Sequence, residues 1–481
     1  MRVMKFGGTS VGDADCIKRA AEITARAARK GAIVAVVSAM GGVTNRLIEA
    51  AQRAAAGEEH AAFNLTSALR GQHVSAIDTL ISDADVRATL TAEVERIIAE
   101  AAGLCRGTAL LRELTPRALA SISSAGERLS ARLMAAALRE LGTDAVAVEA
   151  TELIVTDDHY AQAEPLMAET RERSRERLGE LLAGHTVPVV TGFIGATSKG
   201  VLSTLGRGGS DYAATILGAA LGAEEVIIWT DVDGILTADP RLVPEARTLR
   251  EISYNEAAEL AYFGAKVLHP KTLRPVTGAG IPVRIRNSFK PEHIGTKITR
   301  TGHPTRSGVK AITAISDVSL ITVGGRGIVG VPYVVAKTFA ATAAVSANVL
   351  LISQASSQND ICFIVDSRDA EPTLEALRRV FAFDLDHNRV EHITVNSEIA
   401  VVAVVGEKMR GTVGVSGRTF SAVGRARINV IAIAQGSSEY NISFVVEAAD
   451  MGRAVAAVHQ EFDLDGRAAV DGVKALTEVK G

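Results

Sequence analysis

The sequence has few aromatic residues and few cysteines. Aromatic side chains make up 4% of its 481 residues, although hydrophobic residues make up 47%, with alanine prominent among them. This composition favours closely packed helices and strands with small side chains, and the length predicts roughly two to four domains. The three cysteines, Cys16, Cys105 and Cys362, are widely spaced and odd in number. They indicate neither a disulfide framework nor a metal-ligand cluster, and we expect reduced thiols in the core.

The sequence also lacks a long apolar run and a strong net charge. Met1-Arg-Val-Met-Lys5 leads directly into glycines, without the apolar segment of a signal peptide. The longest uncharged run, residues 338–359, is interrupted by Ser, Thr, Asn and Gln, unlike a membrane span. The net charge of -3 argues against broad binding to nucleic acid or anionic lipid. We therefore expect a cytoplasmic protein with no nucleic acid and no membrane partner.

Residues 1–300 alternate short β-branched runs with helical stretches, which is typical of a three-layer α/β domain. Apolar residues recur at helical spacing over 13–30, and residues 47–115 read as a helical insertion with glycines at its breaks. Residues 299–308 are poor in apolar side chains and have the composition of a linker. The expected strands are residues 3–6, 32–37, 187–191 and 226–230.

The last third of the chain contains an internal repeat. Residues 318–366 align with residues 399–447 without a gap, so we predict two copies of a βαββαβ unit of about 80 residues. Such a unit exposes an open sheet edge, which two copies can bury by pairing side by side. The identical pairs include Phe339 with Phe420, Asn348 with Asn429, Gln354 with Gln435 and Phe363 with Phe444.

These patterns predict three domains. A catalytic domain is expected over 1–300, followed by one repeat over 309–396 and a second over 397–478. One point stays open at the rim of the C-terminal region. Residues 308–312 resemble residues 472–476, and either segment can supply an edge strand.

The segment Lys5-Phe-Gly-Gly-Thr-Ser10 joins a predicted strand to a predicted helix. Gly7 and Gly8 would let the backbone approach a phosphate closely, and the helix N-terminus would add N–H donors. Lys5 can reach the same phosphate oxygens. The lysine precedes the glycines, so this is not a Walker A loop, and a tight turn without a ligand is the alternative interpretation.

A second glycine-rich segment, Leu205-Gly-Arg-Gly-Gly-Ser-Asp211, also opens a predicted helix, over 212–221. Arg207 offers a planar fork for a carboxylate, and Asp211 offers an acceptor for an ammonium group or for Lys5. The alternative is an aspartate N-cap beside a surface arginine.

Two further segments carry polar residues next to predicted elements. Residues 229–240 follow a predicted strand, where α/β folds place ligands, although an ordinary acidic turn is the alternative. Residues 263–270 place Lys266 and His269 near a helix end, where a histidine more often caps the helix than takes part in catalysis.

In this order the segments resemble the aspartokinase branch of the amino-acid-kinase family, and the repeats resemble a tandem pair of ACT domains. The resemblance implies a three-layer amino-acid-kinase domain followed by two ferredoxin-like βαββαβ (ACT) domains. It also implies transfer of the γ-phosphoryl group of ATP, with Mg²⁺, to L-aspartate, the first step towards lysine, threonine and methionine. The matching strings are KFGGTS at 5–10, VVSAMGGVTN at 36–45, SAGERLSA at 124–131, TGFIGA at 191–196, LGRGGSDY at 205–212, WTDVDGI at 229–235 and FGAKVLHP at 263–270.

The resemblance also implies roles for the acceptor site. Glu127 would hold the α-ammonium group of aspartate, with Thr44 alongside, and Arg207 would bind the α-carboxylate. Ser210 and Asp211 would complete the network around the substrate and the catalytic lysine.

For the phosphate side, the resemblance implies that Lys5 contacts the transferring phosphate. Gly7, Gly8 and Ser38 would supply the adjoining backbone and hydroxyl groups. Leu236 departs from the family pattern, because relatives carry a tyrosine there against the nucleotide, and this leaves the adenine contact open. The residues implied to line the ATP side are Thr230, Asp231, Arg241 and Lys266.

The proposed chemistry needs these residue types on physical grounds. The attacking carboxylate has an unperturbed pKa of about 3.9, so it is ionised at neutral pH and needs no general base. Cations and N–H dipoles must instead bring two anions together. Lys5, Arg207, Lys266 and Mg²⁺ suit that task. We expect the metal to be held by ATP phosphates and water, because the sequence has no evident carboxylate cage.

The paired repeats imply a sensor of an end-product amino acid and a homodimer through the ACT domains, with a tetramer left open. Gln354 and Gln435 are the candidate regulatory residues, with threonine favoured over lysine. In the alternative interpretation, both amides satisfy groups at a sheet edge. The chain ends soon after the second repeat, so we expect no fused homoserine dehydrogenase.

Two other functions compete with this interpretation. One is a kinase for another small acceptor, such as acetylglutamate, glutamate or a nucleoside monophosphate, and Glu127 together with Arg207 would discriminate, because an acceptor with a free ammonium group and an α-carboxylate needs both. A non-catalytic amino-acid sensor would show damage at Lys5 or in residues 205–211, and both are intact.

Overall fold

The protein is described by a computed structural model that divides into two compact units. It describes all residues except 265–267, 304, 306, 326–331, 355–359, 410, 437–439 and 466–481. The first unit comprises Met1–Ile235, Arg250–Ala258 and Val267–Gly302, and the second comprises Leu236–Leu249, Glu259–Lys266 and His303–Gly481. In the described ranges, no helix combines the length and the hydropathy that crossing a bilayer requires.

The first unit is built on an eight-stranded sheet of order β3-β5-β2-β1-β8-β10-β11-β9. Neighbouring strands are parallel, except that β10 and β11 are antiparallel. The four strands predicted from the sequence are confirmed as β1, β2, β5 and β8. The strands are β1 (Arg2–Phe6), β2 (Ile33–Val37), β3 (Ala145–Val148), β5 (Val187–Thr191), β8 (Glu225–Thr230), β9 (Glu251–Ser253), β10 (Val283–Asn287) and β11 (Thr296–Thr299).

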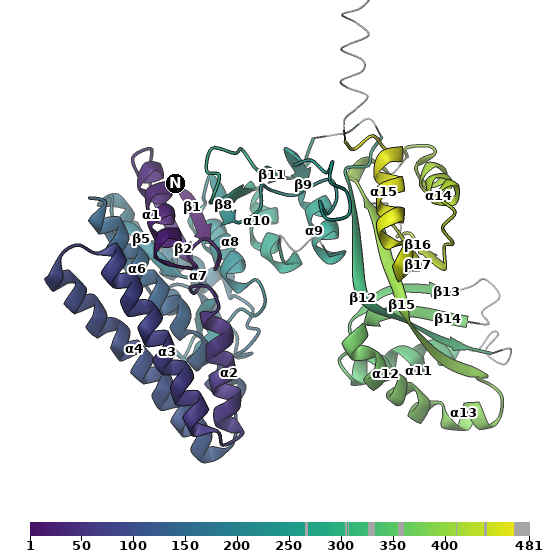
Figure 1. Cartoon of the computed structure of the whole chain (residues 1–481), viewed down its shortest axis with the longest axis horizontal. Helices are drawn as coiled ribbons and strands as arrows, with labels where there is room; N and C mark the ends of the chain where they lie inside the picture. Colours follow the sequence, from purple (N-terminus) through teal and green to yellow (C-terminus); the bar gives the residue numbers. More distant parts are fainter. Residues whose placement is uncertain are drawn as a thin grey trace, which may run out of the picture. The chain divides into compact units, whose positions relative to one another are not determined.

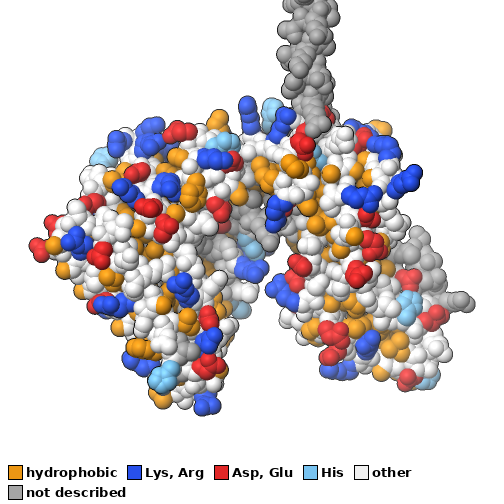
Figure 2. All heavy atoms as spheres, in the orientation of Figure 1, with side chains coloured by type: hydrophobic (Ala, Val, Ile, Leu, Met, Phe, Trp, Pro, Cys, Tyr) orange, Lys and Arg blue, Asp and Glu red, His pale blue; other side chains and the backbone are white. Residues whose placement is uncertain are grey.

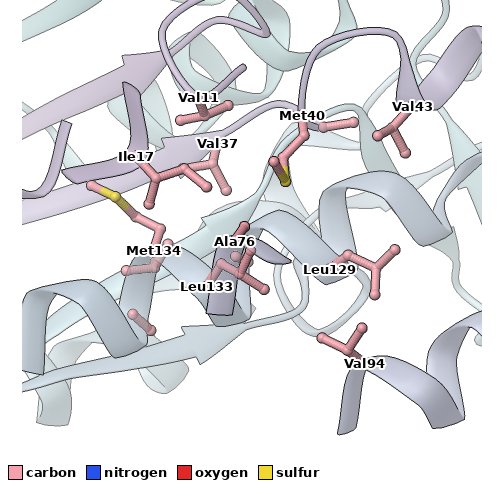
Figure 3. Close-up of a cluster of buried hydrophobic side chains, with 14 of the residues drawn as sticks. Val11, Ile17, Val37, Met40, Val43, Ala76, Val94, Leu129, Leu133 and Met134 are labelled. Atoms are coloured by element: carbon pink, nitrogen blue, oxygen red, sulfur yellow. The ribbon is translucent and has the colours of Figure 1, made fainter. Parts of the chain in front are cut away.

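Helices cover both faces of this sheet (Figure 1). One face packs on α1 (Ala14–Ala28) and α6 (Ala125–Glu140), and the other on α8 (Gly209–Leu221) with α7 (Met167–Ala183) beside it. Because side chains alternate along a strand, Met4 and Phe6 of β1 join the α1–α6 core, whereas Lys5 points to the opposite, α8 face. Figure 3 shows part of the α1–α6 core, where Ile17, Val37, Leu129, Leu133 and Met134 converge.

Residues 47–115 are helical, as predicted, and form α2 (Val43–Ala55), α3 (Glu59–Leu80) and α4 (Ala84–Leu111). The short helix α5 (Pro116–Ser123) follows directly, and α9 (Tyr254–Tyr262) comes much later in the chain, after β9. The expectation that glycines mark the breaks is only partly right. Gly57, with φ 88°, does end a helix, but Gly71, Gly103 and Gly107 lie inside helices. The second break comes instead at Asp83, whose carboxylate caps α4 by accepting from Asp85 N and Val86 N.

A three-stranded sheet lies beside the main one and leads into α8. It consists of β4 (Val155–Thr156), β6 (Ile194–Thr197) and β7 (Leu202–Thr204), in the order β4-β6-β7. Short helices follow further along the chain, namely η2 (Pro270–Leu273) and α10 (Arg274–Ala279).

The second unit contains a six-stranded antiparallel sheet of order β13-β14-β12-β15-β17-β16. Each sequence repeat has its own apolar core, and the cores are built alike. Phe339 packs edge-to-face on Phe363 at 5.6 Å, and Phe420 on Phe444 at 5.7 Å. The elements are β12 (Ala311–Gly324), α11 (Pro332–Ala344), β13 (Val349–Gln354), β14 (Asp360–Asp366), α12 (Ser367–Val380), α13 (Ala382–Asp386), β15 (His392–Val405), α14 (Val415–Arg425), β16 (Ala432–Ala434), β17 (Asn441–Glu447) and α15 (Met451–Glu461).

The two repeats share their central strands β12 and β15. Ala311–Ile315 of β12 pairs with Val401–Val405 of β15, while the other half of β12 pairs with β14. The boundary predicted between 396 and 397 therefore falls inside β15. Of the two candidate edge segments, residues 311–312 are in β12, and residues 472–476 lie outside the described residues.

Acidic and basic side chains are intermixed on the face of each unit that is visible in Figure 2. This distribution accords with the net charge of -3. It gives no single-sign patch on that face of the kind that binds nucleic acid.

Candidate active site

The central strand β1 brings Lys5 to Asp211 of α8. Lys5 Nζ lies 2.5 Å from Asp211 Oδ1, and the two side chains are 9% and 15% exposed. The sequence predicted that Asp211 would serve as an acceptor for Lys5, and the geometry agrees. The alternative prediction, that Asp211 caps the helix, is wrong, because the N-cap position is Gly208 and Asp211 lies in the first turn.

The loop between β1 and α1 is held against the end of β8. Gly7 N and Ser10 Oγ both donate to Trp229 O, at 3.1 and 3.3 Å. A Cβ atom on Gly7 would lie 3.3 Å from Lys5 Nζ, and one on Gly8 would lie 3.4 Å from Ala39 O. The two glycines therefore let the loop pass close to the lysine head group and to the neighbouring backbone.

The glycine-rich segment before α8 is packed closely on two sides. A Cβ atom on Gly208, which has φ 68°, would lie 2.7 Å from His269 Cβ. One on Gly209 would lie 2.6 Å from Phe193 Cδ2. Arg207 is exposed at the tip of this segment, and its charge helps burial to lower the pKa of His269.

Glu127, in the first turn of α6, has a buried carboxyl group, and one of its two oxygens accepts a hydrogen bond. Its Oε1 accepts from Ala39 N at 3.2 Å, whereas Oε2 has no hydrogen-bond partner in the part of the chain that the structure describes. The residue is 3% exposed, and burial raises its pKa to about 8, against the opposing effect of Lys5. A cation placed at Oε2 would favour the ionised form of this carboxyl group.

The turn from β2 into α2 lies next to Glu127. Ser38 N donates to Phe6 O at 3.1 Å, which links this turn to β1. Thr44 is in the first turn of α2, and both residues are partly exposed. A Cβ atom on Gly126 would lie 2.7 Å from Ala39 Cβ, so α6 and this turn are in close contact.

Phe193 is a site residue to which the sequence gave no role. It has φ 65°, and Ile194 N donates to Gly192 O across it at 2.7 Å. This is a γ-turn with a bulky residue at positive φ, a strained arrangement that clusters at functional sites. A Cβ atom on Gly192 would lie 2.7 Å from Ser210 Oγ, so the turn packs directly on the start of α8. Only the backbone angle reveals this feature.

The ends of β8 and β10 form a second polar cluster. Asn287 Nδ2 donates to Asp231 O at 3.2 Å and to Asp233 Oδ1 at 2.6 Å. Lys290 Nζ lies 2.9 Å from Asp233 Oδ2, and this contact lowers the pKa of Asp233. Thr230 Oγ1 donates to Asp231 Oδ1 at 3.1 Å. The sequence predicted Thr230 and Asp231 here but missed Asn287 and Lys290, because β10 itself was not predicted.

Two residues discussed for the nucleotide side, Arg241 and Leu236, belong to the second unit, where Arg241 pairs with Asp239 at 2.5 Å. Lys266 lies outside the described residues. His269 caps η2, with Nδ1 accepting from Lys271 N at 3.3 Å, so the capping interpretation is confirmed.

The two regulatory candidates lie at corresponding places in the second unit. Gln354 ends β13 and Gln435 follows β16, and both are exposed. Next to them, Ser353 Oγ donates to Ile433 O at 3.4 Å. The strands that carry the two amides are therefore neighbours at this point, although they are the two outer strands of the sheet order.

The candidate site has no cage of metal ligands. Among the residues described, no three or more His, Cys, Asp or Glu side chains are grouped to hold an ion. The three cysteines are free thiols, and Cys16 and Cys105 are buried.

Comparison with known families and sequences gives matches over most of the chain. The Amino acid kinase family model matches residues 1–287, and the ACT domain model matches residues 321–381 and 402–462. Bifunctional aspartokinase/homoserine dehydrogenase 1 of Arabidopsis thaliana is 36% identical over 468 residues, which are 96% of this chain and 51% of that protein. Aspartokinase 1 of the same plant is 34% identical over 469 residues, 96% of this chain and 80% of the relative. The chain thus spans about half the length of the bifunctional relatives.

Solved structures of E. coli aspartokinase III have the same fold. The complex with aspartate and ADP, in the R-state, matches with a TM-score of 0.79 at 30% identity, covering 96% of this chain and 99% of that chain. The T-state complex with lysine and aspartate matches with a TM-score of 0.78 at the same identity and coverage.

Proposed function

The chain belongs to the aspartokinase branch of the amino acid kinase family, with two C-terminal ACT domains, and from this premise we propose that it phosphorylates L-aspartate. The reaction converts ATP and L-aspartate into ADP and 4-phospho-L-aspartate. One observation carries the proposal. A shielded lysine, Lys5, and a buried carboxyl oxygen, Glu127 Oε2, which has no partner among the described residues, lie near the carboxyl ends of the central strands β1 and β2. The lysine suits a phosphate, and the carboxyl oxygen suits an ammonium group.

In this proposal the acceptor is recognised at both ends of its backbone. Glu127 receives the α-ammonium group and Arg207 binds the α-carboxylate, while Thr44 and Ser210 add hydroxyl groups. An acceptor without a free ammonium group would leave Glu127 unpaired in a buried place, which costs binding energy. The complex of E. coli aspartokinase III with aspartate supports aspartate as the acceptor.

The transfer step needs charge and alignment more than proton transfer. A side-chain carboxylate oxygen of aspartate forms a bond to the γ-phosphorus, and the bond from that phosphorus to the β,γ-bridging oxygen breaks. ADP leaves with the electron pair, and no proton moves. Lys5 lowers the repulsion between the two anions and stabilises the charge on the transferring group. Asp211 holds the lysine head group, and Gly7 and Gly8 let the loop backbone approach the phosphates closely.

The nucleotide side of the proposal uses Thr230 and Asp231, together with Arg241 and Lys266 from the sequence prediction. The ADP complex of E. coli aspartokinase III supports ATP as the phosphoryl donor. Bound Mg²⁺ would neutralise phosphate charge and would be carried by the ATP phosphates and water.

Regulation by an amino acid is the second part of the proposal. We propose that an effector binds near Gln354 and Gln435. The residues of these segments favour threonine, whereas the lysine complex of E. coli aspartokinase III supports lysine. We further propose a homodimer through the ACT domains, with light scattering of the purified protein as the test that separates dimer from tetramer. A cytoplasmic location is also proposed, and chloroplastic relatives make a plastid the alternative.

The test of the activity is ATP-dependent formation of an acyl phosphate from L-aspartate, trapped as the hydroxamate. Product from aspartate but not from glutamate or acetylglutamate supports the proposal. If another acceptor gives the product, that acceptor takes the place of aspartate as the proposed substrate. The absence of product from every acceptor, with Mg²⁺ and ATP present, favours a non-catalytic amino-acid sensor.

A further inference from the structure

Ser288, immediately after β10, is a buried hydroxyl residue that the sequence analysis did not select. Its Oγ lies 2.8 Å from Ser10 Oγ and 3.1 Å from Thr230 O. Its N–H group also donates to Thr230 O, at 2.8 Å. Ser288 and Ser10 are each 1% exposed, so water cannot replace these hydrogen bonds without local opening.

The two serines have two hydroxyl protons for three oxygen–oxygen contacts. Ser10 Oγ lies 3.3 Å from Trp229 O, and Ser288 Oγ lies 3.1 Å from Thr230 O. If both hydroxyl groups donated only to these carbonyls, the contact of 2.8 Å between the two oxygens would carry no proton. One hydroxyl must therefore donate to the other. The pair acts as a single hydrogen-bonded link between residues 7–10, which we call the phosphate loop, and the ends of β8 and β10.

This link joins the parts of the site that must be aligned for transfer. Ser10 belongs to the loop that carries Gly7 and Gly8, and that loop follows Lys5 directly. Thr230 is the last residue of β8, where the nucleotide side begins. On the other side of Ser288, Asn287 holds the Asp231–Asp233 turn. The ends of three adjacent strands, β1, β8 and β10, thus meet at one hydroxyl group.

We propose that Ser288 is a positioning residue for phosphoryl transfer. It acts through Ser10 to fix the phosphate loop relative to the turn at residues 230–233, on the nucleotide side of the site. This inference rests on the proposed function, because it assigns the two sides of the link to phosphate and nucleotide. Small misplacements of reacting groups lower rates steeply, by as much as about 100-fold for 1 Å. Loss of the link therefore weakens productive nucleotide binding and slows turnover, although both serines are buried.

Kinetics of Ser288→Ala, Ser10→Ala and the double variant provide the first test. We expect each single variant to lower kcat/KM for ATP by about 10- to 100-fold, with a smaller effect on KM for aspartate. The double variant should be no worse than the poorer single variant, because both changes break the same link. Effects that multiply would show that the two serines act separately and would overturn the proposal.

Ser319→Ala is the matched control. Ser319 is fully buried in the second unit, and its Oγ contacts two other serine hydroxyls, of Ser367 at 3.0 Å and of Ser397 at 2.8 Å. Its loss should change the melting temperature by a similar amount and leave uninhibited kcat/KM for ATP unaltered. If Ser288→Ala behaves like this control, its role is only structural.

A second readout does not depend on the acceptor. Trp229 is the only tryptophan in the sequence, its carbonyl accepts from Ser10, and its ring stacks on Phe6. Titration of tryptophan fluorescence with ADP should give a dissociation constant that rises about 10-fold in Ser288→Ala. This titration separates failure of the inference from failure of the proposed function, since nucleotide binding is measured even if aspartate is not the acceptor. An unchanged dissociation constant together with unchanged kcat would overturn the proposal.

Should Ser288→Ala not fold, Ser10→Ala and Ser288→Thr still decide the question. Ser288→Thr keeps the hydroxyl group, and we expect it to retain more kcat/KM for ATP than Ser288→Ala at equal or lower stability. Equal losses in the alanine and threonine variants would assign the effect to packing and contradict a positioning role.

Discussion

Lys5 and Asp211 come from distant parts of the sequence and form an ion pair of 2.5 Å that is largely shielded from water. The pair exists because Lys5 occupies the alternate face of β1 from Met4 and Phe6, and that face packs on α8. A glycine-rich turn brings the first turn of α8, with Asp211, to the strand end. The lysine head group is therefore fixed before any phosphate arrives, and this preorganisation is what electrostatic catalysis requires.

Replacing Lys5 with alanine should abolish turnover. We expect kcat to fall by about 1,000-fold or more, because no other described cation pairs with Asp211. Steady-state kinetics in the hydroxamate assay measure the loss, and light scattering should show an unchanged oligomer. Near-normal turnover would remove Lys5 from the mechanism. Lys337→Ala is the control, since Lys337 pairs at 2.7 Å with the buried Asp384 of the second unit and should affect stability alone.

Aspartate binding should release a proton at neutral pH. Burial raises the pKa of Glu127 to about 8, so the carboxyl group is protonated below that pH, whereas an ammonium ligand needs the carboxylate. KM for aspartate should therefore fall about tenfold for each pH unit between 6 and 8 and then level off. Glu127→Gln should bind aspartate more weakly, and its KM for aspartate should not change with pH over this range. A profile that is equally steep in both proteins would assign the titration to another group.

The same carboxyl group should make stability depend on pH. Its folded pKa of about 8 lies above the unfolded value of 4.5, so the folded state binds the proton more tightly. The free energy of unfolding is therefore greatest, with respect to this group, below pH 4.5 and decreases as the pH rises towards 8. The melting temperature of Glu127→Gln, relative to that of the parent protein, should be higher at pH 8 than at pH 5. A constant difference across this range would contradict the shifted pKa.

Gly126→Ala should disturb the acceptor site without touching a charged group. The added Cβ would lie 2.7 Å from Ala39 Cβ, and the resulting shift would move the N–H group that donates to Glu127. We expect a loss of about 1–3 kcal/mol in unfolding free energy and a KM for aspartate about tenfold higher. Gly71→Ala is the control, because that position in α3 is exposed with open space around it. It should stabilise the protein by about 0.5–1 kcal/mol and leave KM unchanged.

Gln354→Ala should relieve feedback inhibition and leave uninhibited turnover as it was. Gln354 is an exposed residue at the end of β13 in the second unit, so its loss should not disturb the residues around Lys5. Inhibition curves with threonine and with lysine measure the effect. If the effector contacts this amide, its concentration at half-maximal inhibition should rise about tenfold. Unchanged curves with both amino acids would point to an effector site at Gln435 or elsewhere.

The strands that could be predicted from the sequence are those with continuous apolar runs. Ile33–Val37 and Val187–Thr191 are buried throughout, and such runs are recognisable without a partner strand. Val283–Asn287 was missed because arginines alternate with its buried residues. One of them, Arg286, stacks over Trp229 at 4.7 Å, a contact that depends on the neighbouring strand.

The candidate site was predictable where a motif carries the chemistry. Lys5, Glu127 and Asp211 lie in short strings whose residue types fit charge recognition, and the structure places them as buried or shielded groups. Phe193 and Ser288 were not predictable, since one depends on a positive φ angle and the other on adjacent strand ends. Neither property leaves a pattern in a single sequence.

The sharing of β12 and β15 has a consequence for how the second unit unfolds. Each of these strands extends through both repeats, with shifts of register between Ile315 and Leu320 of β12, so neither repeat has a complete sheet of its own. We therefore expect the two repeats to unfold together as one cooperative body. Cutting the chain between 396 and 397 would divide a strand and expose unpaired backbone in both halves. We therefore expect a ligand that stabilises one repeat to stabilise the other.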